Sequence, residues 1–381
     1  MLFCPGPVEI SGRVRHAAVD IAKHHRSSHF EKVLHDIFSG ITENFSIPEN
    51  YATALITGSG TAANEAALAT CIRPGEKILA VNNGEFGMRL AVQARRYGEV
   101  TELTLPWGIT VTEEKLRGYI NKYGPFDWLC GTHNETSTGQ LLDLDMFSRV
   151  ASEYSIKLFI DSISSLGGEQ LDIGTVSPSV ITASVHKCLS ALPGLSLVII
   201  QKQLLGRKDR NTIPVYLNVE NYIDFYNKSG QMPFTPAITL CQALREALLE
   251  LKQETVEGRQ ARYHKNRAVI REGLLDIGWS LWHPEGKESS CITIATCCGG
   301  DKTAIAIMRE LEQIGYHLYP TKGLLMRNDY IMIANMGNLF PEDCKKLLDV
   351  MSRYTCRTAV YLKKIETANA SVNTEPSQGS S

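Results

Sequence analysis

The sequence predicts an α/β protein with a large domain, built on a mostly parallel sheet sandwiched by helices, and a smaller C-terminal α+β domain. Three observations predict this class. From Tyr51 to about residue 201, short apolar runs alternate with helical patterns. A long helical pattern at about 236–257 then precedes a different mixture of strands and helices. The chain of 381 residues, with 43% hydrophobic and 21% charged residues, is long enough for two domains and a large core.

The elements up to residue 201 follow in order. Residues 1–12 form an extended lead-in rich in proline and glycine, and helical patterns follow at about 13–24 and 30–45. Strands are predicted near 52–57, 77–82, 99–105, 127–132, 157–161, 180–184 and 195–201. Helices lie between them, for example at 61–71, 85–97 and 143–154. This alternation is typical of a parallel sheet covered on both faces, in which ligands gather at the carboxyl ends of the strands.

The second half of the chain has a different pattern. Residues 202–234 read as irregular and aromatic, and leucines at helical spacing predict the helix at 236–257. Beyond it we expect a helix to about residue 277, strands near 291–296 and 329–334, and helices near 302–314 and 341–355. The predicted domains are therefore 1–245 and 246–366. Residues 367–381, rich in Ser, Asn, Thr and Gly, are expected to be a disordered tail.

Charge and composition limit the classes of function that the sequence supports. A net charge of -2 gives no argument for nucleic acid or a membrane surface, and no apolar run reaches the roughly 18 residues of a membrane span. The first residues have neither the basic region nor the apolar core of a signal peptide. Ten scattered cysteines are expected to be reduced thiols in a cytoplasmic protein. The histidines at 24, 25 and 29 lack acidic partners and regular spacing, so we expect no metal site.

A lysine lies in an unusual place between two apolar runs. Lys187 follows the run 180–184 and precedes the run 195–200. Burying an ammonium costs several kcal/mol unless it is paired or used chemically, and one use is a Schiff base with an aldehyde. A solvated lysine is the ordinary alternative. However, the strand 157–161 ends in Asp161, and an acid and a lysine at neighbouring strand ends suit pyridoxal phosphate (PLP).

A glycine-rich turn follows the first strand and opens a helix. In this turn, Gly58 and Gly60 let the backbone approach an anion, and Ser59 and Thr61 add hydroxyl donors at the helix N-terminus. The turn predicts a phosphate site. The alternative is a plain strand–helix turn capped by Thr61. The lysine and final glycine of a nucleoside-triphosphate loop are missing.

Two further strand ends carry polar or aromatic residues. The segment 82–87 contains Phe86, which could stack on a flat ring or simply pack locally. The segment 132–139 contains many hydroxyl groups, among them that of Thr136, which suit a ligand or ordinary turns. Together with the glycine-rich turn, Asp161 and Lys187, these strand ends predict a site for a phosphorylated aromatic aldehyde.

The order of these motifs resembles the class V aminotransferases of the PLP-dependent transferase fold type I. The resemblance runs from Pro5-Gly6-Pro7 to about Gly337. It is greatest to the 2-aminoethylphosphonate–pyruvate transaminases and next to the alanine/serine–glyoxylate aminotransferases. It implies that 1–245 is the PLP-binding domain, that the cofactor is pyridoxal 5′-phosphate, and that the protein is a homodimer with shared active sites.

The resemblance also implies which residues meet the cofactor phosphate. Ser59, Gly60 and Thr61 match the family's phosphate-binding turn. His186 takes the place of a Gln or Asn next to the phosphate. Thr235, with the phenylalanine before it, resembles the segment that reaches the phosphate of the neighbouring subunit.

A second group of positions matches the residues around the cofactor ring. Phe86 takes the place of the family's stacking Trp or Tyr, and Ile163 that of the apolar contact beneath the ring. Thr136 falls at the Ser/Thr near the ring hydroxyl. Asp161 matches the partner of the pyridinium nitrogen, and Lys187 matches the Schiff-base lysine.

The substrate side departs from the family pattern. Pro5 and Gly6 match positions near the substrate. The family's carboxylate-binding arginine falls at Met332, which cannot make a bidentate charged hydrogen bond. Either Arg327 reaches in from five residues before, or the substrate is not bound as an ordinary α-carboxylate.

The leading hypothesis is a PLP-dependent aminotransferase. It would use a small donor resembling 2-aminoethylphosphonate, alanine or serine, and a 2-oxo acid acceptor. Met332 leaves open a lyase or decarboxylase on the same fold. A PLP-fold protein without activity is a third possibility, against which the intact pair of Asp161 and Lys187 argues.

Overall fold

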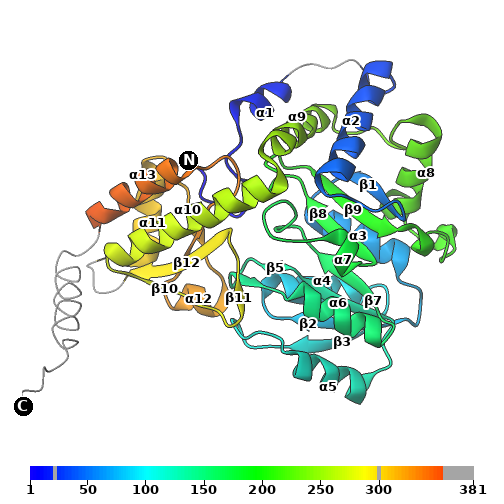
Figure 1. Ribbon diagram of the computed structural model, residues 1–381, viewed down its shortest axis with the longest axis horizontal. Helices are drawn as coiled ribbons and strands as arrows, with labels where there is room; N and C mark the ends of the chain where they lie inside the picture. The colour runs from blue at the N-terminus through cyan, green and yellow to red at the C-terminus, as the bar shows by residue number, and fades with distance from the viewer. Residues whose placement is uncertain (20–23, 298–301, 355–381) are drawn as a thin grey trace, which may run out of the picture.

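The computed structural model describes residues 1–19, 24–297 and 302–354 (Figure 1). The end of the helix predicted at 13–24 and the tail predicted at 367–381 lie outside the described residues. In the described part of the chain, no helix is both long and apolar enough to cross a membrane.

A seven-stranded sheet forms the centre of the large part of the molecule, in the order β1-β9-β8-β7-β4-β2-β3. Its strands are β1 (Tyr51–Thr57), β2 (Lys77–Asn82), β3 (Glu99–Thr104), β4 (Trp128–Thr132), β7 (Lys157–Asp161), β8 (Val180–Ser184) and β9 (Leu195–Gln201). Only β9 runs against its neighbours, pairing antiparallel with both β1 and β8. The predicted strands and the mostly parallel sheet are therefore confirmed.

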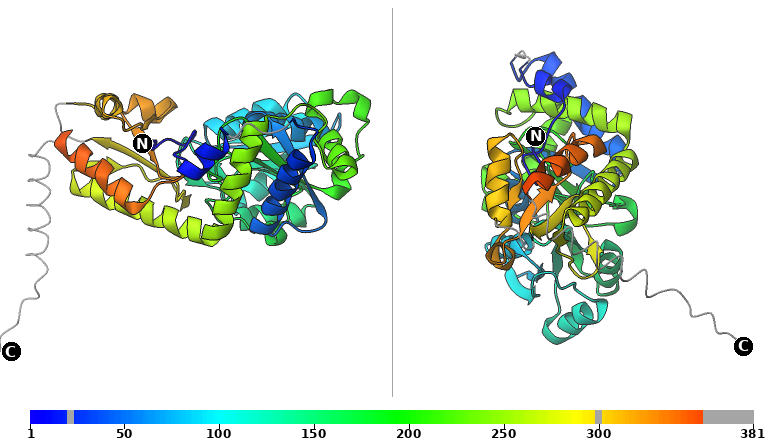
Figure 2. Two further views of the ribbon diagram at one scale, coloured as in Figure 1. Left: turned by 90° about the horizontal axis from the view of Figure 1, so that it is seen from above. Right: turned by 90° about the vertical axis from the view of Figure 1, so that its left-hand side faces the viewer.

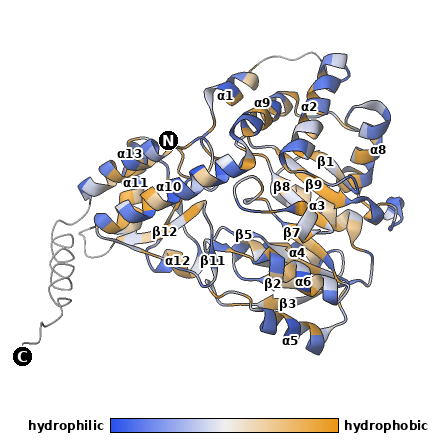
Figure 3. Ribbon diagram, in the orientation of Figure 1, coloured by the Kyte–Doolittle hydropathy of each residue, from blue (hydrophilic) through white to orange (hydrophobic). Residues whose placement is uncertain are grey.

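Alternate residues of β2 show that both faces of this sheet are covered. Ile78 and Ala80 belong to a core cluster with α3 and α4, whereas Leu79 and Val81 belong to a second cluster with α5 and α6. The helices of this part are α2 (Ser28–Asn44), α3 (Gly60–Cys71), α4 (Glu85–Ala94), α5 (Glu113–Tyr123), α6 (Leu144–Glu153) and α7 (Ile173–Val176). Figure 3 shows hydrophobic residues concentrated in central strands such as β9, which is buried along its whole length.

The segment predicted to be irregular, 202–234, contains a helix, α8 (Val219–Ser229), after three short 3-10 turns, η1 (Lys202–Leu204), η2 (Arg210–Thr212) and η3 (Val215–Leu217). Val219, Tyr222 and Ile223 form its buried face. Asn218 caps its N-terminus and Gly230 ends it in a left-handed conformation. The apolar face is short and lies among many aromatic residues, which hid the helical period in the sequence.

Two long helices lead to the smaller part. They are α9 (Ile238–Glu254) and α10 (Val256–Asp276), and they meet at Thr255, whose φ is 65°. The predicted limit after residue 245 falls inside α9, which packs on α2 where Gly40 meets Leu248. Figure 2 shows the two parts side by side along the long axis of the molecule.

The smaller part is a four-stranded antiparallel sheet in the order β10-β12-β14-β13, packed with helices. Its elements are β10 (Trp279–Leu281), β12 (Ile292–Cys297), α11 (Ala304–Gln313), β13 (Tyr319–Pro320), α12 (Gly323–Arg327), β14 (Ile331–Ala334), α13 (Pro341–Met351) and η4 (Ser352–Tyr354). A small sheet joins the two parts: it contains β5 (Asn134–Glu135), β6 (Gln140–Leu141) and β11 (Lys287–Glu288).

The N-terminal lead-in packs against the smaller part. Leu2 bridges to His317 and Glu9 to Gly337, while Phe3 is fully buried in the core of that part. A short helix, α1 (Gly12–Ala17), follows and contacts α9. The lead-in therefore passes between the two parts, which brings Pro5 and Gly6 to the cavity described next.

Candidate active site

A cavity lies at the carboxyl ends of the parallel strands, between the large sheet and the smaller part. It brings together twelve of the fourteen residues predicted for the site: Pro5, Gly6, Ser59, Gly60, Thr61, Phe86, Thr136, Asp161, Ile163, His186, Lys187 and Met332. Arg327, exposed at the end of α12, does not line it, and neither does Thr235, exposed just before α9. The sequence did not point to the other residues of the wall: Asn64, Arg89, Ser137, Tyr319, Pro320, Thr321 and Lys322.

Asp161 is the last residue of β7 and is 5% exposed. Asn64 donates a hydrogen bond from Nδ2 to Oδ2 of Asp161 at 2.9 Å, and the backbone N–H of Ile163 donates to Oδ1 at 2.9 Å. Thr182, the neighbour of Asp161 on β8, donates its hydroxyl to Oδ1 of Asn64. Burial raises the pKa of Asp161, and the hydrogen bonds from Asn64 and Ile163 oppose that shift. The carboxylate is therefore held in one orientation with its acceptor atoms directed at the cavity wall.

Asn64 was missed in the sequence, although a signal was present. It is a fully polar residue one helical turn after Gly60, in the otherwise small and apolar helix α3, and it is 3% exposed. A buried amide must find hydrogen-bond partners. A polar residue on the sheet-facing side of α3 could therefore have been assigned to the acid of a neighbouring strand.

Lys187 lies in the loop after β8 and is 9% exposed. Burial lowers its pKa, and the nearby Asp161 carboxylate acts in the opposite direction. Its Nζ lies 5.4 Å from the centre of the Phe86 ring. A lowered pKa makes the amine easier to deprotonate, and the neutral amine is the form that attacks an aldehyde.

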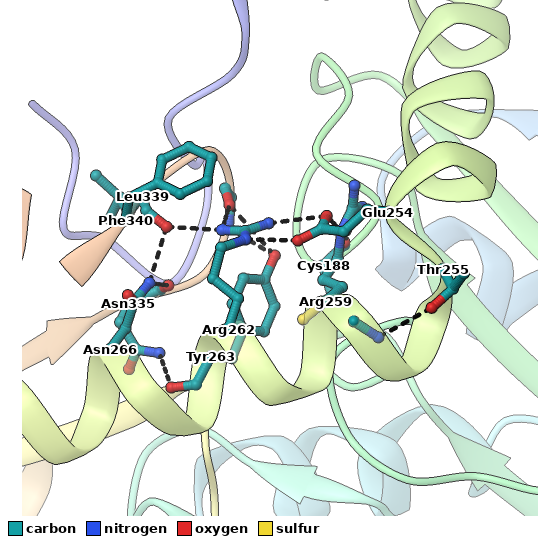
Figure 4. Close-up of polar contacts among 12 residues, drawn as sticks. Cys188, Glu254, Thr255, Arg259, Arg262, Tyr263, Asn266, Asn335, Leu339 and Phe340 are labelled. Carbon is teal, nitrogen blue, oxygen red and sulfur yellow. Dashed lines mark hydrogen bonds and ion pairs between the residues drawn. The ribbon is translucent and has the colours of Figure 1, made fainter.

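Residues of α10 hold the loop that carries Lys187 in place (Figure 4). Arg259 of α10 donates from Nη1 to the carbonyl oxygen of Cys188 at 3.0 Å and from Nε to Glu254 at 2.9 Å. Arg262 also pairs with Glu254 and donates to the carbonyl oxygen of Gly337 at 2.9 Å. One carboxylate at the junction of α9 and α10 therefore links the lysine loop to the strand end after β14.

The glycine-rich turn opens helix α3 beneath this loop. A Cβ on Gly60 would lie 2.7 Å from two carbon atoms of Ile163, so only glycine allows this approach. Ser59 is the N-cap residue, yet its hydroxyl makes no capping hydrogen bond. It is exposed at the cavity, as is Thr61. The turn thus presents two hydroxyl groups and a helix N-terminus to the cavity, which suits an anion.

His186 lies beside this turn, with its Cδ2 near Gly6. Burial, and then the charge of Lys187, lowers its pKa to about 4. Its buried Nδ1 has no hydrogen-bond partner among the described residues. A neutral imidazole with an unused nitrogen is a group that a ligand can satisfy.

Phe86 is held in place by a buried acid. Glu135 of β5, fully buried, accepts hydrogen bonds at Oε2 from the backbone N–H groups of Phe86 at 3.0 Å and Gly87 at 2.9 Å. Burial raises the pKa of Glu135, and hydrogen bonds from Ser137 and these N–H groups oppose the shift. The adjacent Thr136 donates to Oγ of Ser164 at 2.9 Å. The carboxylate thus caps α4 and sets the position of the aromatic ring.

The part of the cavity wall that the smaller part supplies has an apolar residue, Met332, on β14. Met332 is 3% exposed on β14, where it pairs with Ile294 on one side and Tyr319 on the other. Met332 itself supplies no charge at this position of the wall. The cavity therefore has a methionine where the family has its carboxylate-binding arginine. Arg327 does not line the cavity and so does not take the place of that arginine.

These residues fit pyridoxal phosphate. The cavity offers a buried acid, a buried amine and an aromatic ring. Its glycine-rich turn is closely packed on Ile163, and beside that turn lies the unpartnered nitrogen of His186. Each matches a different portion of the cofactor: the ring nitrogen, the aldehyde, the ring face and the phosphate.

Comparison with known proteins gives the same family by independent routes. The family described as aminotransferase class-V matches residues 13–314. The chain is 31% identical over 298 residues, 77% of each chain, to an uncharacterized aminotransferase of Methanocaldococcus jannaschii. It is 28% identical to a 2-aminoethylphosphonate–pyruvate transaminase of Syntrophobacter fumaroxidans, covering 93% of this chain and 97% of that protein. A solved alanine–glyoxylate aminotransferase from Nostoc sp. superposes with a TM-score of 0.85 at 26% identity, covering 93% and 94% of the two chains.

Proposed function

The chain belongs to the class-V aminotransferase family and is a PLP-dependent aminotransferase, and we propose that it moves an amino group from a small amine or amino acid to a 2-oxo acid. The observation that carries this proposal is the meeting of Lys187 and Asp161 in one buried cavity. The relatives are aminotransferases, which favours transamination over the lyase or decarboxylase reaction that Met332 suggested. The donors named for two relatives, 2-aminoethylphosphonate and alanine, define the class of donor that we propose.

The proposed roles of the central residues follow from their positions. Bound PLP supplies an electron sink. Lys187 would hold the aldehyde group through Nζ, and the same atom would take up and release the proton that transamination moves. Asp161 keeps a proton on the ring nitrogen, and Asn64 holds the carboxylate in the required orientation. Phe86 and Ile163 cover the ring and exclude water.

The phosphate end of the cofactor is assigned to a second set of residues. Ser59, Gly60 and Thr61 offer hydroxyl and backbone donors, and His186 offers its unpartnered Nδ1. We place Pro5 and Gly6 at the substrate side, where the lead-in passes the cavity.

We also propose a homodimer with shared active sites. Thr235 is exposed in its own subunit, close to exposed apolar side chains at Val215 and Tyr216. Tyr216 stacks near Phe234 and donates from its hydroxyl to the carbonyl oxygen of Thr57, at the start of the glycine-rich turn. We propose that a second subunit covers this face and brings its own Thr235 to that turn. Free thiols are present at Cys4, Cys71, Cys130, Cys188, Cys241, Cys291 and Cys344, which supports our proposal of a cytoplasmic location.

The test is a donor-by-acceptor screen of the purified holoenzyme with detection of products by mass. We expect 2-aminoethylphosphonate, alanine or serine to convert the cofactor to its amino form, and a 2-oxo acid to restore the aldehyde. Release of carbon dioxide or ammonia without conversion of an oxo acid would instead support a decarboxylase or lyase.

A further inference from the structure

Two cations of the cavity wall share a single carboxylate. Glu85 Oε1 lies 3.5 Å from Nη2 of Arg89 and 3.2 Å from Nζ of Lys322. Arg89 and Lys322 both line the cavity, whereas Glu85 does not. The cluster of Arg89, Lys322 and Glu85 therefore carries one positive charge in excess, and its two cations line the cavity.

The two cations come from different parts of the molecule. Arg89 lies on α4 of the large part, and Lys322 precedes α12 of the smaller part. Their side chains are 41% and 42% exposed, so their ion pairs with Glu85 are weak and can exchange partners readily. A bound anion would thus bridge both sides of the cleft at little cost.

Arg89 is within reach of the reacting amine. Its Cζ lies 5.0 Å from the centre of the Phe86 ring, and Nζ of Lys187 lies 5.4 Å from the same point. The two groups are therefore separated by no more than the sum of these distances, which a small molecule can span.

We propose that Arg89 and Lys322 bind the anionic group of the amino donor, so that the preferred substrates are short amines that carry a carboxylate or phosphonate. This inference rests on the proposed function. The guanidinium supplies a planar pair of donors and the ammonium a point charge, and both carboxylate and phosphonate oxygens accept such bonds. The anion neutralises the excess charge that Glu85 leaves.

The test compares donors with and without an acid group in single variants of the holoenzyme. 2-Aminoethylphosphonate and 3-aminopropanoate are the acidic donors, and propylamine is the donor that lacks an acid group. We expect Arg89→Gln and Lys322→Gln each to raise KM for the acidic donors about tenfold or more, with little change in kcat or in KM for propylamine. Glu85→Gln should act in the opposite direction, because it removes the competing carboxylate. Arg327→Gln, at an exposed arginine outside the cavity, is the matched control and should change nothing.

Binding of an acid that has no amino group tests the role of the two cations independently of turnover. Titration of the holoenzyme with methylphosphonate or acetate, followed by the absorbance of the cofactor, should give a Kd about tenfold higher in Arg89→Gln and Lys322→Gln than in the wild type or Arg327→Gln. Equal binding in all four proteins would overturn the inference. Conversion of wild-type holoenzyme by none of the donors in the screen would count against the proposed function, while the titration would still decide the role of the two cations. Comparison of the Kd values for methylphosphonate and acetate shows whether the site prefers a phosphonate or a carboxylate.

Discussion

Asn64 donates a hydrogen bond to Asp161 at 2.9 Å across 97 residues of sequence, and so joins the helix after the glycine-rich turn to the acid at the end of β7. The same amide accepts the hydroxyl of Thr182, which fixes which of its atoms faces the acid. Asn64 therefore connects α3, the helix that begins at the proposed phosphate site, to Asp161, the proposed partner of the ring nitrogen.

We expect Asn64→Leu to keep the cofactor but to lower activity by about tenfold. Loss of the amide removes a hydrogen bond that opposes the raised pKa of Asp161, so the carboxyl is protonated more readily and holds the ring-nitrogen proton less well. The change is checked by kcat and by the pH dependence of the cofactor absorbance. A purely structural role would lower stability and leave the spectrum unchanged.

Asp161→Asn should retain cofactor and lose activity by about 100-fold or more. A neutral amide cannot stabilise the protonated ring nitrogen, and removal of one electrostatic stabiliser typically has an effect of this size. Single-turnover rates with the best donor provide the measurement. Turnover close to that of the wild type would mean that another group has this role.

Lys187→Ala should abolish transamination and remove the cofactor link that borohydride traps. The prediction rests on the buried position of Lys187 and its lowered pKa. Mass spectrometry of peptides from the reduced wild-type protein locates the modified lysine. Modification of a different lysine would contradict the assignment.

Met332→Arg is expected to speed the return of the cofactor from its amino to its aldehyde form with pyruvate or glyoxylate. A guanidinium in the cavity wall could bind the carboxylate that methionine cannot, and a charged bidentate pair of this kind changes affinity by about 100-fold. Arg327→Ala should leave this step unchanged, since Arg327 is exposed outside the cavity. The measurement is the rate of recovery of the aldehyde form in wild type and both variants. Slower recovery in Arg327→Ala would show that this arginine reaches the substrate after all.

His133 should make the apoprotein less stable in acid. It is 3% exposed, and burial lowers its pKa to about 3, so the native state keeps it neutral while the unfolded chain protonates it near its ordinary pKa of about 6.5. Its contribution to stability is therefore fully present above about pH 6.5 and is lost as the pH falls toward 3. In His133→Gln the unfolding free energy should depend less on pH, by up to about 1.4 kcal/mol per pH unit over that range. Urea unfolding at several pH values compares the two slopes, and parallel slopes would contradict the prediction.

Local patterns were sufficient for the strand ends. The residues at the carboxyl ends of β1, β2, β4, β7 and β8 were predicted together, because parallel strands bring these ends to one edge of the sheet. Met332 was located differently, from the resemblance to the family, whose carboxylate-binding arginine falls at this position. The helix α8 was missed because its buried residues span only 219–223, little more than one turn, and lie in a segment with many aromatic residues.

The sequence by itself determined the α/β order, the acid, the lysine and the glycine-rich turn, since each depends on residues close together in the chain. Only the tertiary structure decided what surrounds them. Glu135 reaches Phe86 across 49 residues, and Lys322 reaches Glu85 across 237. Such pairs depend on how α4 packs against β5 and against the segment before α12. A single sequence does not indicate the distance between side chains on separate elements. The cap that Glu135 forms on α4, and the carboxylate of Glu85 that Arg89 and Lys322 share, are therefore seen only in the folded structure.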